Sequence, residues 1–509
     1  MSRQNIFCTE VTSPPCGIII FGASGDLTSR KLLPALFSLY NRKLLNENFF
    51  ILGCSRTDYS SEEFKNKVYD TIKKSAKITS EDILNSFVDH CFYISGDYFG
   101  SNLYEKLSIK LNELENSFKT SHNRIFYCAT PPNIYLEIIC SLGKASLNKP
   151  FDNNSWSRII VEKPFGSDIN TSMDLDRRLL STLKEEQIYR IDLYLGKETV
   201  QNILMLRFAN SIFEPLWNSN YIDHIQVLVS ETIGIGHRAG YFEKAGLLRD
   251  MCQNHMLQLL TLIAMEPPAV YDANKVRDEK IKLLSSIRSF DQDNICNNFV
   301  RGQYVSGIVE NQDVLAYRNE KNVNHDSNIE TFTAFKLFID NWRWRGVPFY
   351  FRVGKRLKQT LTGVAVVFKS VPHSMFDRDS SNAADKNILF LTVQPKEGIS
   401  LKILAKYPGP KSCLTPVNLN FCYKDEFKID LPEAYERLLL DCMHGDQTLF
   451  IRHDFMKLSW NLMSPVLNEW AKPDSKCPLY DYKAGSWGPE AANKLIENDG
   501  RKWLITKLE

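Results

Sequence analysis

Three polar side chains that could do chemistry lie close together in the sequence, at Asp192, Tyr194 and Lys197. They supply a carboxylate, a phenol and an amine, and the helix-like run at 199–210 would hold them in place. This combination suits a small polar ligand that carries negative charge. The alternative is the start of a helix whose Asp and Lys are only solvated, and the rest of the chain decides between the two.

A glycine turn follows the first apolar run of the chain. The run at 17–21 stops at Gly22-Ala23-Ser24-Gly25-Asp26-Leu27, and apolar residues then recur at helical spacing. Strand, glycine turn and helix in this order predict a dinucleotide site, because the backbone can approach a pyrophosphate whose charge the helix N-terminus complements. The spacing is G-x-x-G and not the full three-glycine fingerprint, so the next strands have to support it.

Arg56 follows the second predicted strand, at 49–53. An NAD-binding protein would place Asp or Glu here for the ribose hydroxyls. A guanidinium can bind a 2′-phosphate that a carboxylate would repel, so Arg56 favours NADP over NAD. The alternative is an exposed loop arginine.

Further apolar runs at 125–129 and 158–162 alternate with helical stretches. This alternation predicts an α/β, Rossmann-like dinucleotide-binding domain over residues 1–189 with a mainly parallel sheet. Lys163 directly follows the second run, at the end of a strand where open α/β sheets bind ligands. It is a site candidate; the alternative is an ordinary surface lysine.

The pattern changes over residues 190–509, which we assign to a larger α+β domain. Residues 223–231 alternate with period two, which predicts a half-exposed antiparallel strand. Strand-like runs recur at 332–339, 348–353, 364–368, 388–393 and 399–403. They predict a broad, mainly antiparallel sheet with helices. The polar stretches 285–298 and 319–328 read as loops.

Composition excludes several classes of partner. The 509 residues contain 62 basic and 60 acidic side chains without a long block of one sign, which gives no support for a nucleic-acid or membrane surface. The partner is therefore expected to be a small molecule. Twelve cysteines without C-x-x-C pairs or metal spacing predict reduced, mostly buried thiols and a cytoplasmic protein. We expect no signal peptide and no membrane span.

Residues 245–265 predict a helix in which His255 lies on the apolar stripe. A histidine in that position is either a satisfied core residue or a catalytic one. Asp250 is close in sequence, but on an ideal α-helix it lies about 140° round from His255. Both can address one ligand only if Asp250 lies where the helix begins.

Taken together, the residues resemble the glucose-6-phosphate dehydrogenase family over nearly the whole chain beyond about residue 15, with a final block of bacterial character. The blocks that carry the resemblance are Gly22-Ala23-Ser24-Gly25-Asp26-Leu27, Glu162-Lys163-Pro164-Phe165-Gly166, Arg190-Ile191-Asp192 with Tyr194-Leu195-Gly196-Lys197-Glu198, Arg249-Asp250 with Gln253-Asn254-His255, Gly354-Lys355, Gln394-Pro395, Pro432-Glu433-Ala434-Tyr435-Glu436-Arg437-Leu438, and Gly485-Ser486-Trp487-Gly488-Pro489.

The resemblance implies oxidation of glucose 6-phosphate at C1 to 6-phosphoglucono-δ-lactone with NADP, in the oxidative branch of the pentose phosphate pathway, by a homodimer or homotetramer without a metal. His255 would be the base and Asp192 its carboxylate partner. Lys163 would lie between sugar and cofactor, and Tyr194 and Lys197 would bind the phosphate. The remaining sugar-binding positions are Glu231, Asp250, Lys355 and Gln394.

Two positions depart from the family pattern. Leu193 stands where the family has a histidine that helps to hold the 6-phosphate, and Thr360 stands where relatives usually carry a basic residue; Lys358 or Arg356 could partly replace the latter. Losing one contact with a charged phosphate costs about 1.5–3 kcal/mol. The alternatives are a dehydrogenase of the same fold with another sugar preference, or a nucleotide-binding subunit without turnover. The presence of both Asp192 and His255 argues against the subunit.

Overall fold

The computed structural model describes residues 11–75, 80–373, 375, 386–428 and 431–504, and the side chains of residues 237, 292 and 293 are not described. Cys8 and the first ten residues, part of the stretch examined for a signal peptide, lie outside this range. The chain divides into two compact units. The first comprises Met1–Gly196, Val270–Arg277 and Pro432–Met456, and the second comprises Lys197–Ala269, Asp278–Leu431 and Lys457–Glu509. Residues 190–196, 270–277 and 432–456 of the predicted second domain thus belong to the first unit.

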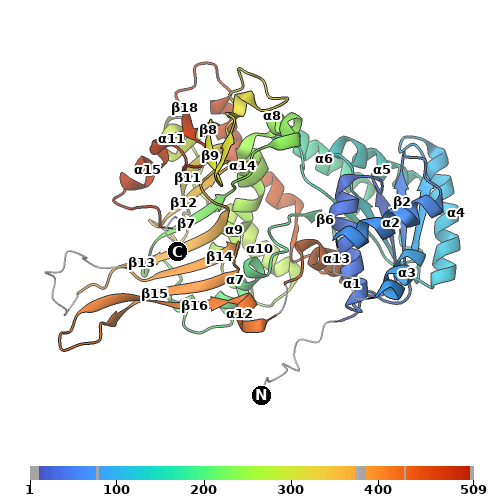
Figure 1. Cartoon of the computed structure of the whole chain (residues 1–509), viewed down its shortest axis with the longest axis horizontal. Coiled ribbons are helices and arrows are strands. Elements are labelled where there is room, and N and C mark those ends of the chain that lie inside the picture. The colour runs from blue at the N-terminus through green and yellow to red at the C-terminus, as the bar shows by residue number, and fades with distance from the viewer. Residues whose placement is uncertain (1–10, 76–79, 374, 376–385, 429–430, 505–509) are drawn as a thin grey trace. The chain divides into compact units, whose positions relative to one another are not determined.

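The first unit is a doubly wound sheet with helices on both faces (Figure 1). Within the described residues its strands have the order β17-β6-β5-β4-β1-β2-β3. Neighbours are parallel except β17, which is antiparallel to β6. The predicted Rossmann-like fold is confirmed. The strands are β1 Cys16–Phe21, β2 Phe49–Ser55, β3 Cys91–Ser95, β4 Arg124–Cys128, β5 Ser157–Val161, β6 Ile188–Ile191 and β17 Phe450–Ile451; the helices are α1 Leu33–Asn41, α2 Ser61–Ser75, α3 Glu81–Asp89, α4 Ser101–Phe118, α5 Pro132–Lys144, α6 Ile169–Thr182 and α13 Ala434–His444.

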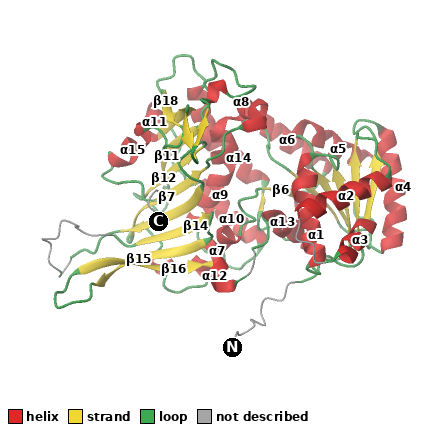
Figure 2. Ribbon diagram, viewed as in Figure 1, coloured by secondary structure: helices red, strands yellow, loops and turns green. Residues whose placement is uncertain are grey.

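The second unit is built on a large mixed sheet (Figure 2). In the part of the chain that is described, its strand order is β16-β15-β14-β13-β7-β12-β11-β8-β18, with parallel pairing at β7–β12 and β8–β18 and antiparallel pairing elsewhere. The predicted broad, mainly antiparallel sheet is confirmed. Its strands are β7 Ile222–Ser230, β8 Phe299–Val305, β11 Phe332–Phe338, β12 Pro348–Gly354, β13 Leu361–Phe368, β14 Ile388–Gln394, β15 Gly398–Lys406, β16 Leu414–Cys422 and β18 Leu479–Lys483, beside a small hairpin of β9 Gly307–Val309 and β10 Gln312–Val314.

The helices of the second unit include a π-helix in the middle of the predicted 245–265 helix. They are α7 Glu198–Phe208, α8 Ala239–Leu247, the π-helix η5 Leu248–Met256, α9 Leu257–Ala264, α11 Gln292–Asn298, α12 Tyr423–Phe427 and α15 Glu490–Glu497; α10 Ala273–Leu284 and α14 His453–Trp470 contain residues of both units. Helix α11 corrects the prediction of a loop over all of 285–298. No helix among the described residues is long and apolar enough to span a membrane.

Strand β7 is not half-exposed, as its alternating sequence predicted. It lies between β13 and β12, and nearly every residue in it is buried. Its polar side chains are bonded internally: Gln226 Nε2 donates to the carbonyl oxygen of Lys502, 2.8 Å away, and Ser230 Oγ donates to the carbonyl oxygen of Gln359 at 2.6 Å. The period-two pattern was therefore correct for a strand and wrong for its exposure.

Asp223, at the start of β7, gives a pH-dependent contribution to stability. Burial would raise the pKa of this carboxyl, but hydrogen bonds from His224, Arg501 and Lys386 outweigh burial and hold the pKa well below its ordinary value. A carboxyl with a lowered pKa stabilises the fold above its ordinary pKa of about 3.9, and that contribution is lost as the pH falls below it. Urea unfolding from pH 7 to 3 should therefore show a steeper loss of unfolding free energy for the wild type than for Asp223→Asn. Parallel profiles would contradict this assignment.

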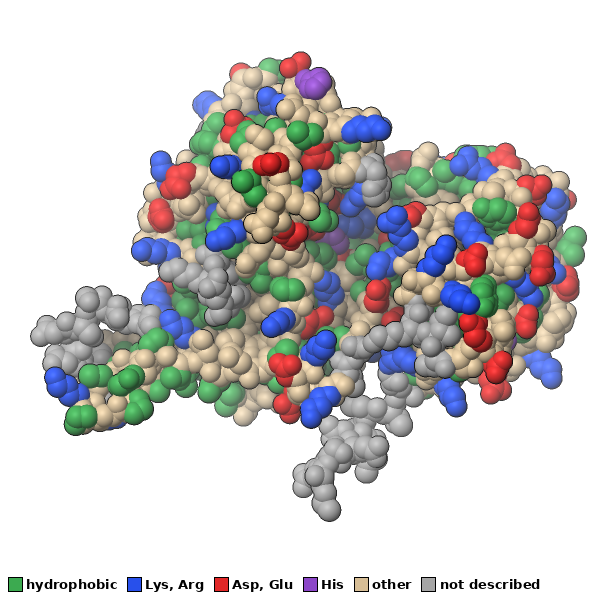
Figure 3. Space-filling model, viewed as in Figure 1, with side chains coloured by type: hydrophobic (Ala, Val, Ile, Leu, Met, Phe, Trp, Pro, Cys, Tyr) green, Lys and Arg blue, Asp and Glu red, His purple; other side chains and the backbone are tan. Residues whose placement is uncertain are grey.

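Two of the cysteines form a disulfide, which corrects the prediction that the thiols are all reduced. Cys296 is bonded to Cys477, across 181 residues of sequence. Most of the free cysteines among the described residues are buried, as predicted. Figure 3 shows basic and acidic side chains interspersed over the visible face, in agreement with the absence of single-sign blocks in the sequence.

Candidate active site

The predicted site residues fall into two groups, one in each unit. The first unit contains the glycine turn, Arg56, Lys163, Asp192 and Tyr194, and the second contains Lys197, Glu231, Asp250, His255, Lys355 and Gln394. Each group has its own local geometry.

A cavity of about 500 Å³ opens at the carboxyl ends of β1, β2 and β4. Of the predicted cofactor-binding residues, Gly22, Ser24, Gly25 and Arg56 line it. Sequence reasoning did not assign the remaining lining residues, which are Ser55, Thr57, Tyr98, Ala129, Thr130, Pro131 and Ile134. The turn at 130–131 had a signal in the sequence, because it ends a predicted strand, whereas Tyr98 had none.

The glycine turn is shaped for close approach by a ligand. Gly22 has φ +88°, and a Cβ at this residue would lie 2.5 Å from the carbonyl oxygen of Ala129. Its N–H donates to Tyr98 Oη at 3.1 Å, and Ser24 Oγ accepts hydrogen bonds from Ser55 and Thr57, both at 3.0 Å. A turn that a Cβ would fill, at the start of a helix, fits a dinucleotide pyrophosphate.

Four predicted cofactor residues do not line this cavity: Lys163 and three residues of the glycine turn. Ala23 is buried beneath the turn, Leu27 precedes the π-helix η1, Thr28–Leu32, and Asp26 is exposed and pairs with Arg30 at 2.7 Å. The three residues of the turn belong to the motif because they lead into the helix that follows it.

Lys163 follows a half-buried glutamate that sequence reasoning did not place in the site. Glu162 Oε1 accepts hydrogen bonds from Tyr127 Oη at 2.5 Å and from Tyr435 Oη at 3.1 Å. Burial raises the pKa of the Glu162 carboxyl, and the two hydrogen bonds partly oppose this change. These hydrogen bonds fix the chain at the end of β5, directly before Lys163.

Asp192 lies at the end of β6 and is fully buried. The N–H of Tyr194 donates to Asp192 Oδ1 at 3.0 Å, and the N–H of Leu195 donates to its carbonyl oxygen at 3.1 Å. Arg190, which precedes it, pairs with Asp176 and Glu185 inside the same unit, both at 2.7 Å. Arg190 is therefore structural, and the turn that follows it holds Asp192 in place.

The π-helix η5 changes the angle expected between Asp250 and His255 around the helix axis. An α-helix would separate them, but a π-helix closes its backbone bonds from i to i+5, so residues five apart lie close to one face. Asp250 is also in the first turn of η5, and both residues are 6% exposed. Asp250 Oδ1 accepts a hydrogen bond from Tyr241 Oη at 3.3 Å and lies 3.8 Å from Arg238 Nη2.

A buried glutamate holds the beginning of η5 and was missed by sequence reasoning. Glu330 Oε1 accepts a hydrogen bond from the N–H of Leu248 at 2.9 Å, and its carbonyl oxygen accepts one from the N–H of Leu247 at 3.2 Å. Burial raises the pKa of the Glu330 carboxyl. Glu330 lies in a polar stretch about 75 residues beyond the helix in the sequence. A cap from so distant a residue leaves no pattern in the sequence near the helix.

One ion pair and one hydrogen bond position the other polar candidates of the second unit. Lys355 is buried and its Nζ lies 2.7 Å from Glu231 Oε2. Lys197 Nζ donates to Gln394 Oε1 at 2.7 Å, and Gln394 Nε2 donates to Thr362. Burial lowers the pKa of the Lys197 ammonium, against the influence of nearby carboxylates.

The two departures from the family pattern have defined surroundings. Leu193 is half-buried in the turn after Asp192. Thr360 is exposed, and its Oγ1 lies 3.0 Å from Thr232 Oγ1. Arg356, a possible substitute for the basic residue, lies 3.8 Å from Glu320, and Lys358 is exposed.

A Rossmann-like unit with a pyrophosphate-binding turn, followed by a unit with a buried histidine and carboxylate on one helix, is the organisation of a nucleotide-dependent dehydrogenase. Comparison with known families specifies which one. The model "Glucose-6-phosphate dehydrogenase, NAD binding domain" matches residues 19–202, and "Glucose-6-phosphate dehydrogenase, C-terminal domain" matches residues 204–504. The chain belongs to the glucose-6-phosphate dehydrogenase family.

Individual relatives match over their whole length. Glucose-6-phosphate 1-dehydrogenase of Chlamydia pneumoniae is 45% identical over 497 residues, which cover 97% of this chain and 96% of the relative. The Bacillus subtilis protein of that name is 40% identical, with 96% and 98% covered. A solved glucose-6-phosphate dehydrogenase in complex with its substrate glucose-6-phosphate has a TM-score of 0.89 and 34% identity, with 98% and 100% covered. The Mycobacterium avium structure has a TM-score of 0.80 and 32% identity, with 96% and 99% covered.

Proposed function

We propose that this protein is an enzyme that oxidises glucose 6-phosphate at C1 to 6-phosphoglucono-δ-lactone with NADP. The observation that supports the proposal is the π-helix η5, which carries both Asp250 and His255, in a chain that matches its family over both domains. NADPH formation, followed by absorbance with glucose 6-phosphate, glucose and other hexose phosphates, tests it. Preference for another sugar, or NADP binding without turnover, would overturn it.

His255 takes the proton of the C1 hydroxyl in the proposed reaction. Bound NADP supplies the two-electron acceptor for the hydride. Departure of hydride would leave positive charge on C1 if the hydroxyl proton remained, and a histidine accepts that proton near neutral pH. The roles of Asp192 in orienting the imidazole and of Lys163 near the reacting atoms stay predictions from the family motifs.

The sugar phosphate would be held by the charged groups of the second unit together with Tyr194. Lys355 is kept in place by Glu231, and Lys197 by Gln394, so each ammonium has a fixed partner before the substrate binds. Such preorganisation lowers the entropy lost on binding. Asp250 would accept a hydrogen bond from a sugar hydroxyl.

The replacement of Leu193 by histidine should strengthen the phosphate contact. A histidine would restore a hydrogen-bond donor, and we expect Leu193→His to lower KM for glucose 6-phosphate by about tenfold. Steady-state kinetics with glucose 6-phosphate measures this. Leu193→Met, which keeps a hydrocarbon of similar volume, is the matched control and should leave KM nearly unchanged. An unchanged or higher KM in the histidine variant would mean that the pocket is built around the leucine.

The location and the assembly also belong to the proposal. We place the enzyme in the cytoplasm, where NADP-dependent sugar oxidation would supply NADPH. A homodimer or homotetramer is expected from the family, and exposed apolar side chains along the β15–β16 hairpin, Tyr407, Leu414 and Leu419, support association. Sedimentation velocity would determine the state.

A further inference from the structure

The segment 477–489 lies against the loop that carries Lys355, and the proposed reaction gives this segment no role. Three hydrogen bonds join them. Tyr482 Oη donates to the carbonyl oxygen of Lys355 at 2.7 Å, and the N–H of Gly485 donates to that of Arg356 at 2.8 Å. The N–H of Lys358 in turn donates to the carbonyl oxygen of Ser486 at 3.0 Å. The segment 477–489 therefore holds this loop in place.

The turn after β18 is shaped for tight packing. Gly485 has φ +83°, and a Cβ at this residue would lie 2.0 Å from the carbonyl oxygen of Ile308. Only glycine fits here. The turn thus fixes the position of the end of strand β18.

Tyr482 makes the central contact between the segment 477–489 and the loop that carries Lys355. It is 3% exposed, and its hydroxyl also lies 3.2 Å from the carbonyl oxygen of Thr331, which accepts the N–H of Lys355 at 3.0 Å. On the other side, the ammonium of Lys355 pairs with Glu231. The backbone of Lys355 is thus held by Tyr482, and its side chain by a carboxylate.

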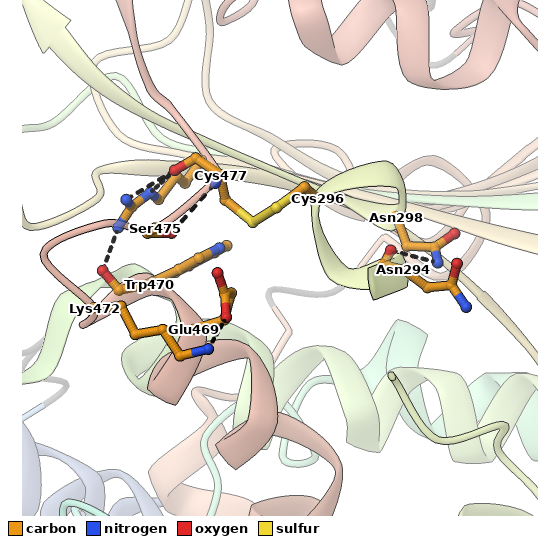
Figure 4. Close-up of a disulfide and its surroundings, with 9 residues drawn as sticks. Asn294, Cys296, Asn298, Glu469, Trp470, Lys472, Ser475 and Cys477 are labelled. Carbon is orange, nitrogen blue, oxygen red and sulfur yellow. Dashed lines mark hydrogen bonds and ion pairs between the residues drawn. A yellow bond between two sulfur atoms is a disulfide. The ribbon is translucent and has the colours of Figure 1, made fainter. Parts of the chain in front are cut away.

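The strand that carries Tyr482 is held at its start by the disulfide. Strand β18 is at the edge of the sheet and, within the described residues, pairs only with β8. Cys477 precedes β18, and Cys296 lies on α11, which ends where β8 begins (Figure 4). Arg301 adds hydrogen bonds from Nε and Nη2 to the carbonyl oxygen of Cys477, at 3.1 and 2.9 Å.

The two sulfur-bearing residues differ in accessibility. Cys296 is half-buried, whereas Cys477 is 2% exposed. A thiolate from solution would therefore reach the disulfide from the side of Cys296. Glu469 lies beside both sulfurs and is buried, so the surroundings of the bond are not purely apolar.

We propose that Tyr482 is a positioning residue for Lys355, and that the Cys296–Cys477 disulfide makes this positioning dependent on redox state. A dithiol reductant supplies two electrons and two protons, the S–S bond breaks, two thiols form, and the reductant becomes a disulfide. The edge strand is then held by fewer constraints, Tyr482 holds Lys355 less firmly, and affinity for glucose 6-phosphate falls. The inference rests on the proposed function, in which Lys355 binds the substrate.

The role of Tyr482 is tested by Tyr482→Phe, which removes only the hydroxyl. We expect KM for glucose 6-phosphate to rise about three- to tenfold, because the buried carbonyl group of Lys355 loses its hydroxyl donor. The kcat and the KM for NADP should stay nearly constant, whereas general loss of structure would change them as well. Tyr480→Phe, on the same strand but exposed, is the matched control and should behave as the wild type.

The role of the disulfide is tested by comparing oxidised and dithiol-treated enzyme. Thiol titration should find two fewer thiols in the oxidised form, and reduction should raise KM for glucose 6-phosphate in the wild type and in Cys413→Ser, an exposed-cysteine control. A Cys296→Ser/Cys477→Ser variant should have the higher KM with or without dithiol. Hydrogen exchange of the amides at 354–358 and 479–486 should speed up on reduction.

The possible outcomes separate the two proposals. The inference would be overturned if both forms had the same number of thiols. It would also be overturned if the KM for glucose 6-phosphate changed neither in Tyr482→Phe nor on reduction. Either result would leave the proposed function intact. Absence of turnover with glucose 6-phosphate in every form would overturn the proposed function. Hydrogen exchange would still decide whether the disulfide and Tyr482 hold the Lys355 loop.

Discussion

Replacing His255 by asparagine should lower kcat for glucose 6-phosphate oxidation by about 10²- to 10⁴-fold, the range typical of a lost general base. Asparagine is polar and similar in size to imidazole, but it cannot accept a proton from the C1 hydroxyl near pH 7. The KM should change little, because the charged groups that hold the substrate remain. Steady-state measurement of NADPH formation checks both values.

The control for this variant is His325→Asn, which changes an exposed histidine of the same unit. It should keep the wild-type kcat. The location of His255 on a buried π-helix makes a folding measurement necessary, so the thermal unfolding of each variant should be compared as well. A kcat near the wild-type value in a folded His255→Asn enzyme would show that another group takes the proton.

Replacing Arg56 by alanine should weaken NADP binding by about 10- to 150-fold and leave NAD binding nearly unchanged. Arg56 is exposed at the end of β2 and lines the dinucleotide cavity, and no carboxylate among the described residues pairs with it. Its guanidinium is thus available for a 2′-phosphate. Titration of the binding of each cofactor, or KM for each, measures the difference.

Arg30→Ala provides the comparison for Arg56. Arg30 is exposed near the same glycine turn but is not among the residues that line the cavity, and it pairs with Asp26. Its removal should affect NADP only slightly, through the general charge of the surface. Equal losses of NADP and NAD in Arg56→Ala would mean that Arg56 does not distinguish the two cofactors.

Sequence patterns predicted the strands that contain an uninterrupted apolar run. β1, β2, β4 and β5 each contain such a run, and the run is buried on both faces of a parallel sheet. β6 was missed because it is short and contains Arg190, whose charge is paired with Asp176 of α6 and with Glu185. The exposure of β7 was wrong because the partners of Gln226 come from residues 502–504. Long-range partners of this kind leave no periodic signal.

The candidate site was predictable by residue type and not by geometry. The ideal-helix angle between Asp250 and His255 was misleading, since periodicity cannot distinguish an inserted π-helix from an α-helix. Glu330 acts on this helix from a distant loop, and Tyr482 acts on Lys355 from the last strand. The disulfide could not be predicted, because its two cysteines are 181 residues apart in the sequence and come together only in the folded chain. All of these contacts required the tertiary structure.

The discontinuity of the first unit has a consequence for biosynthesis. β17 pairs with β6, and Gln447 Nε2 donates to the carbonyl oxygen of Ile188, about 260 positions earlier. A ribosome releases β6 long before these partners emerge, so the outer side of β6 stays uncovered while most of the second unit is made. An uncovered strand edge invites pairing with other chains. The first unit therefore cannot be completed until residues 432–456 have been made, and a nascent chain stalled before residue 450 would present an unpaired strand edge.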